Sequence, residues 1–163
     1  MAKNKEEKTN VMRVLEQKKI AYTPHSYPHE EGIAVDGVTV AKSMGFDPAI
    51  VFKTLVARGA SKQYYVFDVP VAENLDLKKA AKAVGEKSIE MIHQKELLPL
   101  TGYVHGGCSP VGMKKLFPTV IDASAENLET MIVSAGKIGY QVELSPRDLA
   151  ALVRAKFADL IAE

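Results

Sequence analysis

Cysteine and tryptophan are the residues that this sequence most conspicuously lacks: it has one cysteine, Cys108, and no tryptophan among 163 residues. One thiol cannot form an internal disulfide, and it cannot supply the several thiolates of a cysteine-rich zinc cluster. A secreted scaffold held together by disulfide bonds is therefore excluded, and so is a zinc-ribbon type of domain.

An excess of either charge is also missing, because 21 Lys and Arg residues and 20 Asp and Glu residues leave a formal net charge of +1. A broad basic field is thus excluded as the means of binding nucleic acid, and we expect no DNA partner. No apolar run approaches the roughly 20 residues needed to cross a bilayer, and the charged N-terminal stretch lacks the apolar region of a signal peptide. We therefore expect a cytoplasmic protein with no membrane partner.

The composition is that of a globular protein, with 47% hydrophobic and 25% charged residues. The length suits one domain with a full hydrophobic core. The sequence contains no internal repeat, low-complexity tract or linker. We assign residues 1–163 to a single domain, in which the charged residues 1–8 form a flexible N-terminus.

Local signals predict an α+β fold. Capping residues and apolar spacing predict helices that begin at Thr9 or Asn10, Asp36, Asp76 and Ser145, with a further turn at Asp47-Pro48. Two apolar segments, Val51–Ala57 and Gln63–Val69, predict a central pair of strands joined as a hairpin. Shorter strands are expected at 20–22, 89–92, 103–105, 119–121, 131–133 and 139–144. Most links between strands are too short for a crossover helix, so the pairing should be mostly antiparallel.

Lys53 stands out because it lies within the first of these apolar strands. Its ammonium group must either extend to water along its aliphatic stem or meet an anion. The sequence leaves two interpretations open. Lys53 is either a lysine near a strand end that reaches solvent, or a lysine in a pocket that holds a phosphate or a developing oxyanion.

A glycine-rich segment, TGYVHGGCSPVG at 101–112, contains four glycines and one proline. Such a segment can expose successive backbone N–H groups to a ligand. It lacks the glycine spacing and the Lys-Ser/Thr pair of the known phosphate-binding loops. The pattern alone leaves a structural turn and a binding loop as alternatives.

Other chemistry has little support in the sequence. His105 lies three residues before Cys108, but within a glycine-rich segment this spacing places no base beside the thiol. His25 and His29 have the spacing of helical metal ligands, but two neighbouring prolines oppose a helix there. We expect no cysteine nucleophile, no metal and no cofactor.

Three segments, in this order and at this spacing, resemble the YbaK/EbsC family: VFKTLV around Lys53, LDLKKAAKAVG at 75–85 and TGYVHGGCSPVGMKK at 101–115. The resemblance extends from the first helix to Ala158. It implies an α+β fold with a mixed, partly closed sheet flanked by helices. It also implies a stand-alone editing enzyme that deacylates mischarged Cys-tRNA(Pro). Because an apolar pocket separates cysteine from proline only weakly, a second, hydrolytic site is the general remedy.

The resemblance also implies the residues of the site. Lys53 would hold the 3′-terminal adenosine, and the N–H groups of Gly106 and Gly107 would polarise the ester carbonyl, as catalytic positions. Substrate-binding positions would be Tyr27, Thr54, Ser109, Pro110, Ser134 and Gln141. Gln141 departs from the family pattern, because it stands where an aspartate is expected and an amide cannot act as a carboxylate base.

The mechanism that the resemblance favours uses the substrate's own thiol. The thiol attacks its ester carbonyl and releases tRNA and a thiolactone, while the protein positions the reactants. On this hypothesis Cys108 and all four histidines are dispensable. With a net charge of +1 the protein alone should bind tRNA weakly, so a transient complex with prolyl-tRNA synthetase would supply specificity. Two alternatives stay open: a deacylase for alanine or serine, and a non-catalytic module that binds aminoacyl-tRNA or a nucleotide.

Overall fold

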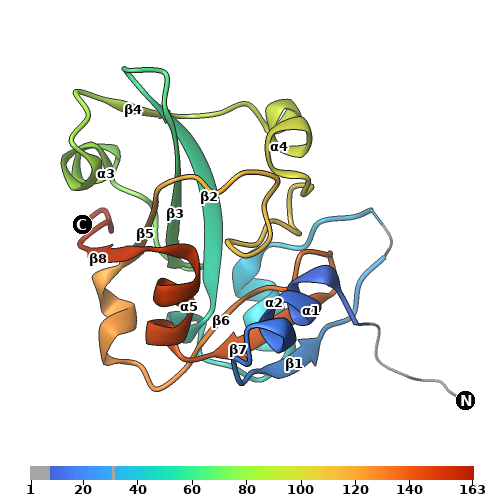
Figure 1. The fold of residues 1–163 in the computed structure, drawn as a ribbon. Coiled ribbons are helices and arrows are strands. Elements are labelled where there is room, and N and C mark those ends of the chain that lie inside the picture. Colours follow the sequence, from blue (N-terminus) through green and yellow to red (C-terminus); the bar gives the residue numbers. More distant parts are fainter. Residues whose placement is uncertain (1–7, 31) are drawn as a thin grey trace, which may run out of the picture.

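Two long strands, β2 (Phe52–Gly59) and β3 (Tyr64–Pro70), form an antiparallel hairpin at the centre of the computed structural model (Figure 1). The structure describes residues 8–30 and 32–163, so the expected flexible N-terminus lies outside the described residues except for Lys8. β4 (Ile89–Met91) pairs antiparallel with β2. Beyond β3, the strands β5 (Thr119–Asp122) and β8 (Lys156–Ala158) continue the sheet in parallel.

A second sheet has three antiparallel strands in the order β1 (Thr23–Ser26), β7 (Tyr140–Leu144) and β6 (Met131–Ser134). One parallel bridge, between Val51 and Ile132, joins it to the start of β2. Four strand pairs are antiparallel and two are parallel, which confirms the expected α+β fold with mostly antiparallel pairing. The finding refines the expected single, partly closed sheet, because the described strands form two open sheets.

Helices cover the sheets from several sides, and their predicted caps are present. The helices are α1 (Asn10–Gln17), α2 (Gly37–Ser43), α3 (Leu77–Val84), α4 (Gln94–Thr101), α5 (Pro146–Val153) and the short 3₁₀ helices η1 (Pro48–Ile50) and η2 (Ala123–Asn127). The side chains of Thr9, Asp36, Asp76 and Ser145 accept hydrogen bonds from backbone N–H groups of the first helical turn. No helix in the described ranges has the length and hydrophobicity of a membrane span.

The β2–β3 hairpin separates two hydrophobic clusters. One cluster lies between the hairpin, α1, α5 and the second sheet, and includes Leu15, Val56, Val66, Met131 and Leu149. The other lies between the hairpin and α3, and includes Ala57, Phe67, Val69, Ala80 and Leu160. Because successive side chains of a strand point to opposite faces, the hairpin supplies residues to both clusters.

Two of the predicted strands are wrong. Residues 20–22 are not a strand, because Lys19 has a positive φ of 60° and the Ile20 N–H donates to the Leu15 carbonyl to close α1. Residues 103–105 are not a strand either, because Gly102 has a φ of 89° and the chain then turns. Four elements were not predicted: β1, η2, α4 and β8. Pro99 lies inside α4 and argues against a helix there, and β8 has only three residues.

Candidate functional site

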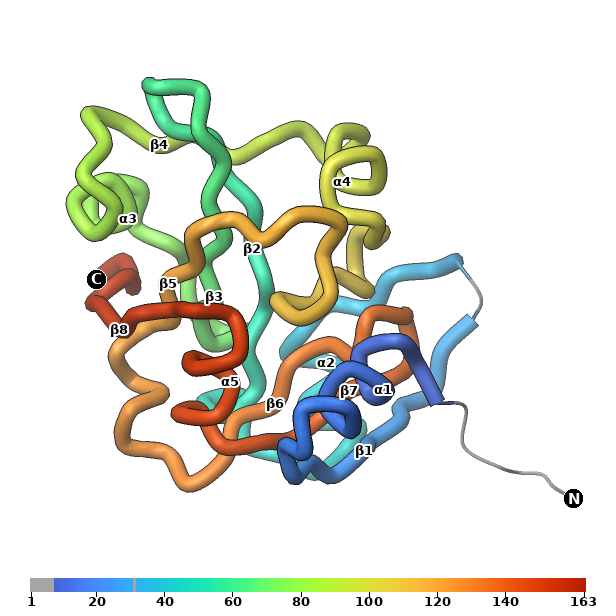
Figure 2. The backbone as a smooth tube through the Cα atoms, in the orientation of Figure 1, coloured from blue at the N-terminus to red at the C-terminus, as the bar shows by residue number. Residues whose placement is uncertain are grey.

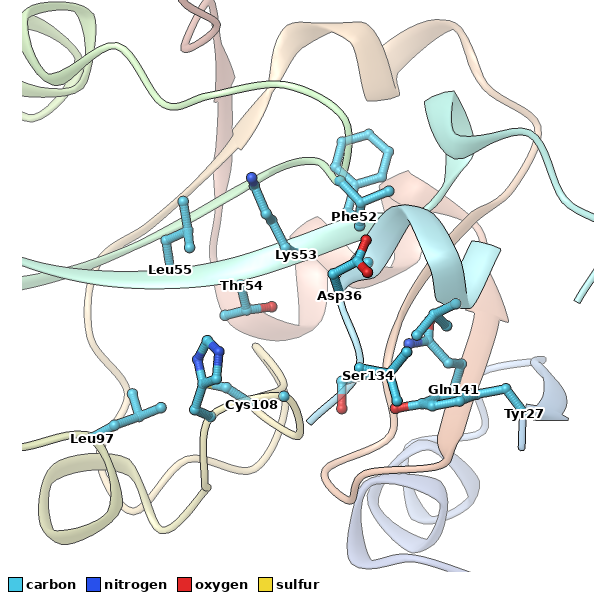
Figure 3. A pocket seen from close by; sticks show the side chains of 16 residues that line it. Tyr27, Asp36, Phe52, Lys53, Thr54, Leu55, Leu97, Cys108, Ser134 and Gln141 are labelled. Atoms are coloured by element: carbon cyan, nitrogen blue, oxygen red, sulfur yellow. The ribbon is translucent and has the colours of Figure 1, made fainter. Parts of the chain in front are cut away.

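A cavity of about 320 Å³ opens where β2 meets the second sheet and the glycine-rich segment (Figure 3). Its lining comes from parts of the chain that are far apart in sequence, and Figure 2 shows the segment after α4 folding back beside β2. The lining includes six of the predicted site residues: Tyr27, Lys53, Thr54, Gly106, Ser134 and Gln141. The fold therefore brings these positions to one place.

The other three predicted residues, Gly107, Ser109 and Pro110, are buried and are not part of this lining. The Gly107 N–H donates to the Val104 carbonyl oxygen at 2.9 Å, so the expectation that it polarises a substrate carbonyl is not met in this conformation. Ser109 Oγ accepts from the Val111 N–H at 3.2 Å. In this structure the three residues hold the shape of the glycine-rich segment.

Gly106 differs from its neighbour because it reaches the cavity. Its φ of 89° lies in the region that favours glycine, and an added Cβ would come within 2.7 Å of the Ala34 Cβ. Its N–H has no hydrogen-bond acceptor among residues 8–30 and 32–163. This position thus needs a glycine and leaves a backbone donor available beside the cavity.

Lys53 and Thr54 leave β2 in opposite directions, and both contribute to the cavity wall (Figure 3). Lys53 is half-buried. Burial lowers the pKa of its ammonium group, and the nearby Glu73 carboxylate opposes this change. Lys53 therefore lines a cavity, and the prediction that it holds an anion there stays a prediction.

Behind Thr54 the fold buries a carboxyl group, Asp68, directly opposite it in the β2–β3 register. Asp68 is 0% exposed, and its Oδ1 accepts a hydrogen bond from Thr54 Oγ1 at 2.6 Å. Its Oδ2 has no hydrogen-bond partner in the described part of the chain. Burial, partly opposed by the Thr54 hydrogen bond, raises the pKa of Asp68 to about 7.

Asp68 is not among the predicted site residues, although the sequence carries a signal for it. The strand YYVFDVP carries one acidic residue among apolar ones, the same kind of anomaly that drew attention to Lys53. What the sequence did not show was the register that places Thr54 opposite this carboxyl group.

Cys108, His105 and Asp36 also line the cavity. Burial, with a contribution from the charge of Asp68, raises the pKa of the Cys108 thiol to about 12, so the thiol is protonated and weakly nucleophilic at neutral pH. The Asp36 carboxylate accepts hydrogen bonds from the Thr39 hydroxyl at 2.6 Å and the Thr39 N–H at 3.1 Å, which lower its pKa. Asp36 therefore acts as the cap of α2.

The second sheet supplies the polar end of the cavity, where Figure 3 shows Tyr27, Ser134 and Gln141 grouped together. Ser134 and Gln141 are direct partners in the β6–β7 register, and each is 8% exposed. The Gln141 Oε1 is buried without a hydrogen-bond partner among the described residues. A buried amide oxygen in this state can accept a hydrogen bond from a ligand.

The two N-terminal histidines take part in packing around the second sheet. His25 Nε2 lies 2.8 Å from Glu143 Oε1, and His29 Nδ1 lies 2.9 Å from the Tyr27 carbonyl oxygen. The His29 ring packs against Gly139, where a side chain would collide with it. Within the described ranges there is no group of three or more His, Cys, Asp and Glu side chains placed to hold a metal ion.

Comparisons with solved structures agree with this architecture. A crystal structure described as "a putative trans-editing enzyme for prolyl tRNA synthetase" is 26% identical, with a TM-score of 0.79 over 94% of this chain and 95% of the other. The "hypothetical protein APE2540" is 20% identical, with a TM-score of 0.82 over 93% of this chain and 99% of the other. The latter similarity concerns the fold alone.

Sequence comparisons are more specific. The chain is 44% identical over 161 residues to the Enterococcus faecalis protein named "Putative Cys-tRNA(Pro)/Cys-tRNA(Cys) deacylase EbsC", covering 98% of each. The family model described as "Aminoacyl-tRNA editing domain" matches residues 34–152, a range that holds Lys53, the glycine-rich segment and Gln141. This chain therefore belongs to the aminoacyl-tRNA editing domain family, as a member of the YbaK type.

Proposed function

We propose that this protein is a trans-editing deacylase that removes cysteine from mischarged Cys-tRNA(Pro). The observation that supports this most is the single cavity that joins Lys53, Gly106 and the polar end of the second sheet in a member of the editing family. Its volume of about 320 Å³ is within the range of small-ligand sites. The similarity to the Enterococcus faecalis protein supports cysteine as the amino acid.

Each wall of the cavity has a role in this proposal. Lys53 holds the 3′-terminal adenosine by its positive charge, and the Gly106 N–H polarises the ester carbonyl. Thr54 and the group at the polar end, Tyr27, Ser134 and Gln141, surround the aminoacyl moiety. Gly107, Ser109 and Pro110 act indirectly, because they fix the glycine-rich segment.

The chemical step that we propose uses the thiol of the substrate. An aminoacyl ester is already activated, and a thiol with a pKa of about 8.5 is partly ionised at neutral pH. The thiolate attacks its own ester carbonyl, tRNA leaves, and the resulting thiolactone reacts with water. The protein holds the reacting atoms together and stabilises the developing oxyanion through Gly106.

Specificity for the tRNA body is proposed to come from a partner. A net charge of +1 supports weak binding to tRNA by the protein alone, and a transient complex with prolyl-tRNA synthetase would raise the local substrate concentration. A single domain of this kind, acting on aminoacyl-tRNA, would work in the cytoplasm. A cavity that contacts only the amino acid and the tRNA end would also accept Cys-tRNA(Cys), the second substrate in the name of the Enterococcus faecalis relative.

The test is hydrolysis of Cys-tRNA(Pro), Cys-tRNA(Cys), Ala-tRNA(Pro) and Ser-tRNA(Pro) by the full chain, with and without prolyl-tRNA synthetase. We expect rapid loss of both cysteine esters and slow loss of the other two. Lys53→Ala should reduce the rate by roughly 100-fold. Lys78→Ala, which removes an exposed lysine on α3, is the matched control and should have no effect.

Three results would contradict the proposal in different ways. Preferential hydrolysis of the alanine or serine ester would change the substrate and exclude thiol assistance. Binding of an aminoacyl-adenosine analogue without turnover of any ester would indicate a non-catalytic module. A Lys53→Ala variant with full activity would show that Lys53 does not hold the 3′-terminal adenosine.

A further inference from the structure

The cavity wall offers few groups that can take a proton from a ligand. The Asp36 carboxylate is engaged by Thr39, and Gln141 has an amide in place of a carboxylate. The Cys108 thiol is already protonated at neutral pH. His105, which is exposed at the rim, is the other titratable side chain of the wall beside Lys53 and Tyr27. A substrate thiol must nevertheless lose its proton before it attacks an ester.

Thr54 links the cavity to a carboxyl group that the cavity does not contain. Its hydroxyl donates its hydrogen to Asp68 Oδ1 at 2.6 Å, a length typical of an O–H···O⁻ hydrogen bond. The lone pairs of Thr54 Oγ1 are then left as acceptors, and Thr54 is part of the cavity wall. A ligand group that donates a hydrogen bond to Thr54 is thereby connected to Asp68.

Asp68 has no ion-pair partner among the described residues on its own face of the sheet. Arg58, four residues along β2 from Thr54 on that face, pairs instead with Glu90 and Glu96. Lys53 of β2 and Asp122 of β5 alternate with Thr54 and Ile121, the direct neighbours of Asp68, and so belong to the opposite face. From the glycine-rich segment, Cys108 is the titratable group that interacts with Asp68. No cation compensates the carboxylate on this face among the described residues.

We propose that Asp68 accepts the proton of the substrate thiol through the hydroxyl group of Thr54, so that the buried pair Thr54–Asp68 acts as the proton relay of the cavity. This inference rests on the proposed deacylation of a cysteinyl ester. Asp68 does not touch the substrate in this proposal, and it acts on the substrate only through Thr54.

In this reaction two protons move together. The thiol proton passes to Thr54 Oγ1 while the Thr54 hydroxyl proton passes to Asp68 Oδ1. The electron pair left on sulfur forms a bond to the ester carbonyl carbon. The bond from that carbon to the ribose oxygen then breaks, its electron pair stays on the ribose oxygen, and this oxygen takes a proton from water. Asp68 returns its proton to solvent before the next cycle.

The acidity of the two groups suits this transfer. Burial raises the pKa of Asp68 to about 7, whereas a free thiol has a pKa of about 8.5. A proton acceptor works best when its pKa lies near the working pH. An ordinary surface aspartate, with a pKa near 4, would be a much weaker base.

The experiment is the pH dependence of kcat/KM for Cys-tRNA(Pro) between pH 5.5 and 9, corrected for spontaneous hydrolysis. For the wild type we expect a rate that rises with pH and levels off above an inflection near 7. In Asp68→Asn the rate at pH 7 should fall at least roughly 30-fold, and the inflection should move to about 8.5, the pKa of the free thiol. Thr54→Val should behave like Asp68→Asn.

Two variants serve as controls. Thr54→Ser keeps the hydroxyl group and should keep the inflection near 7. His105→Asn removes the imidazole that lines the cavity, and it too should keep the inflection. Asp68→Asn also removes a buried charge, so it should unfold at a higher temperature than the wild type at pH 8, which separates lost chemistry from lost folding.

The possible contrary results are distinct. An Asp68→Asn variant that is active within threefold and keeps the inflection near 7 would overturn the relay. Loss of the inflection in His105→Asn would also overturn it and assign the base to His105. A folded wild type that leaves Cys-tRNA(Pro) intact would reject the proposed function, and this inference with it.

Discussion

The two faces of the β2–β3 hairpin differ in what they bury. On the face toward α3, the pairs Leu55–Phe67 and Ala57–Tyr65 are apolar, and only Lys53, at the cavity end of the strand, is charged. On the other face, Thr54 and Asp68 form a polar pair beside the cavity. Both faces of the two strands pack against a hydrophobic cluster, but the Thr54 face also buries a carboxyl group.

The two kinds of buried pair have opposite effects on the stability of the fold. A buried apolar pair stabilises the fold roughly in proportion to the area that it removes from water. A buried carboxylate with one hydrogen bond destabilises the fold, because desolvation outweighs that bond. The Thr54–Asp68 pair therefore lowers the stability of the hairpin, and in our proposal this destabilisation maintains a proton acceptor beside the substrate.

The largest expected effect comes from breaking the apolar face. Phe67 is 0% exposed, and its ring lies 6.4 Å from that of Tyr65. Phe67→Ala should lower the free energy of unfolding by about 3–5 kcal/mol, because it leaves a cavity in the core. Urea denaturation would measure the change, and deacylation by the remaining folded protein should be unaltered. A variant that is stable but inactive would show that Phe67 itself is needed for the shape of the cavity.

The next effect concerns the polar face and its pH dependence. The pKa of Asp68 is raised from 3.8 to about 7 in the folded chain, so the folded state holds a proton that the unfolded state has released between these values. Stability from this group is therefore fully present below about pH 4 and decreases as pH rises through 7, by up to about 4 kcal/mol.

The measurement is the free energy of unfolding of the wild type minus that of Asp68→Asn from pH 4 to 8. Other carboxyl groups, such as Glu143 and Asp36, have lowered pKa values and the opposite pH dependence, but they are common to both proteins and cancel in the difference. A difference that stays constant with pH would show that Asp68 does not titrate near neutrality.

A smaller effect is expected from the segment that closes the polar face. A Cβ at Gly107 would come within 3.0 Å of the Ile138 backbone nitrogen and 3.3 Å of the Lys137 carbonyl carbon. Because these are backbone atoms, Gly107→Ala should shift the segment and cost about 1–3 kcal/mol of stability. The temperature of thermal unfolding and the rate of deacylation should both fall. An unchanged rate of deacylation would show that the shape of the glycine-rich segment does not affect the cavity.

The smallest effect is expected at Cys108, which lies beside Asp68 but takes no part in our mechanism. Cys108→Ala should keep deacylation within about threefold of the wild type and lower stability by about 1 kcal/mol, the loss expected for a small buried side chain. Deacylation assays and urea denaturation of the two proteins would measure this. Complete loss of activity in a folded variant would indicate a protein nucleophile and contradict substrate-thiol assistance.

Features set by neighbouring residues could be predicted from the sequence. The caps at Thr9, Asp36, Asp76 and Ser145 depend on one helical turn, and the central hairpin depends on a short connection between two apolar segments. The resemblance to a known family implied nine site residues, and six of them share one cavity.

Features set by distant pairing could not be predicted in this way. The place of β1 at the edge of the second sheet depends on its pairing with β7, and no local pattern encodes that partner. The Thr54–Asp68 hydrogen bond depends on strand register, which two apolar strands do not display in their sequences. The Gly107 N–H donates to the Val104 carbonyl oxygen in a turn, where the sequence predicted a strand at 103–105. This hydrogen bond was therefore not predicted either.

The pairing of β1 with β7 also bears on how the protein is made. Strand β1 ends at Ser26, and its partner begins at Tyr140. At roughly 5–20 residues per second, a ribosome needs about 6–23 s to synthesise the residues between them. During that time Thr23–Ser26 has no strand to pair with, and Ser134 and Gln141 do not yet exist. The cavity therefore forms only in the nearly completed polypeptide, and a nascent chain released early would lack it.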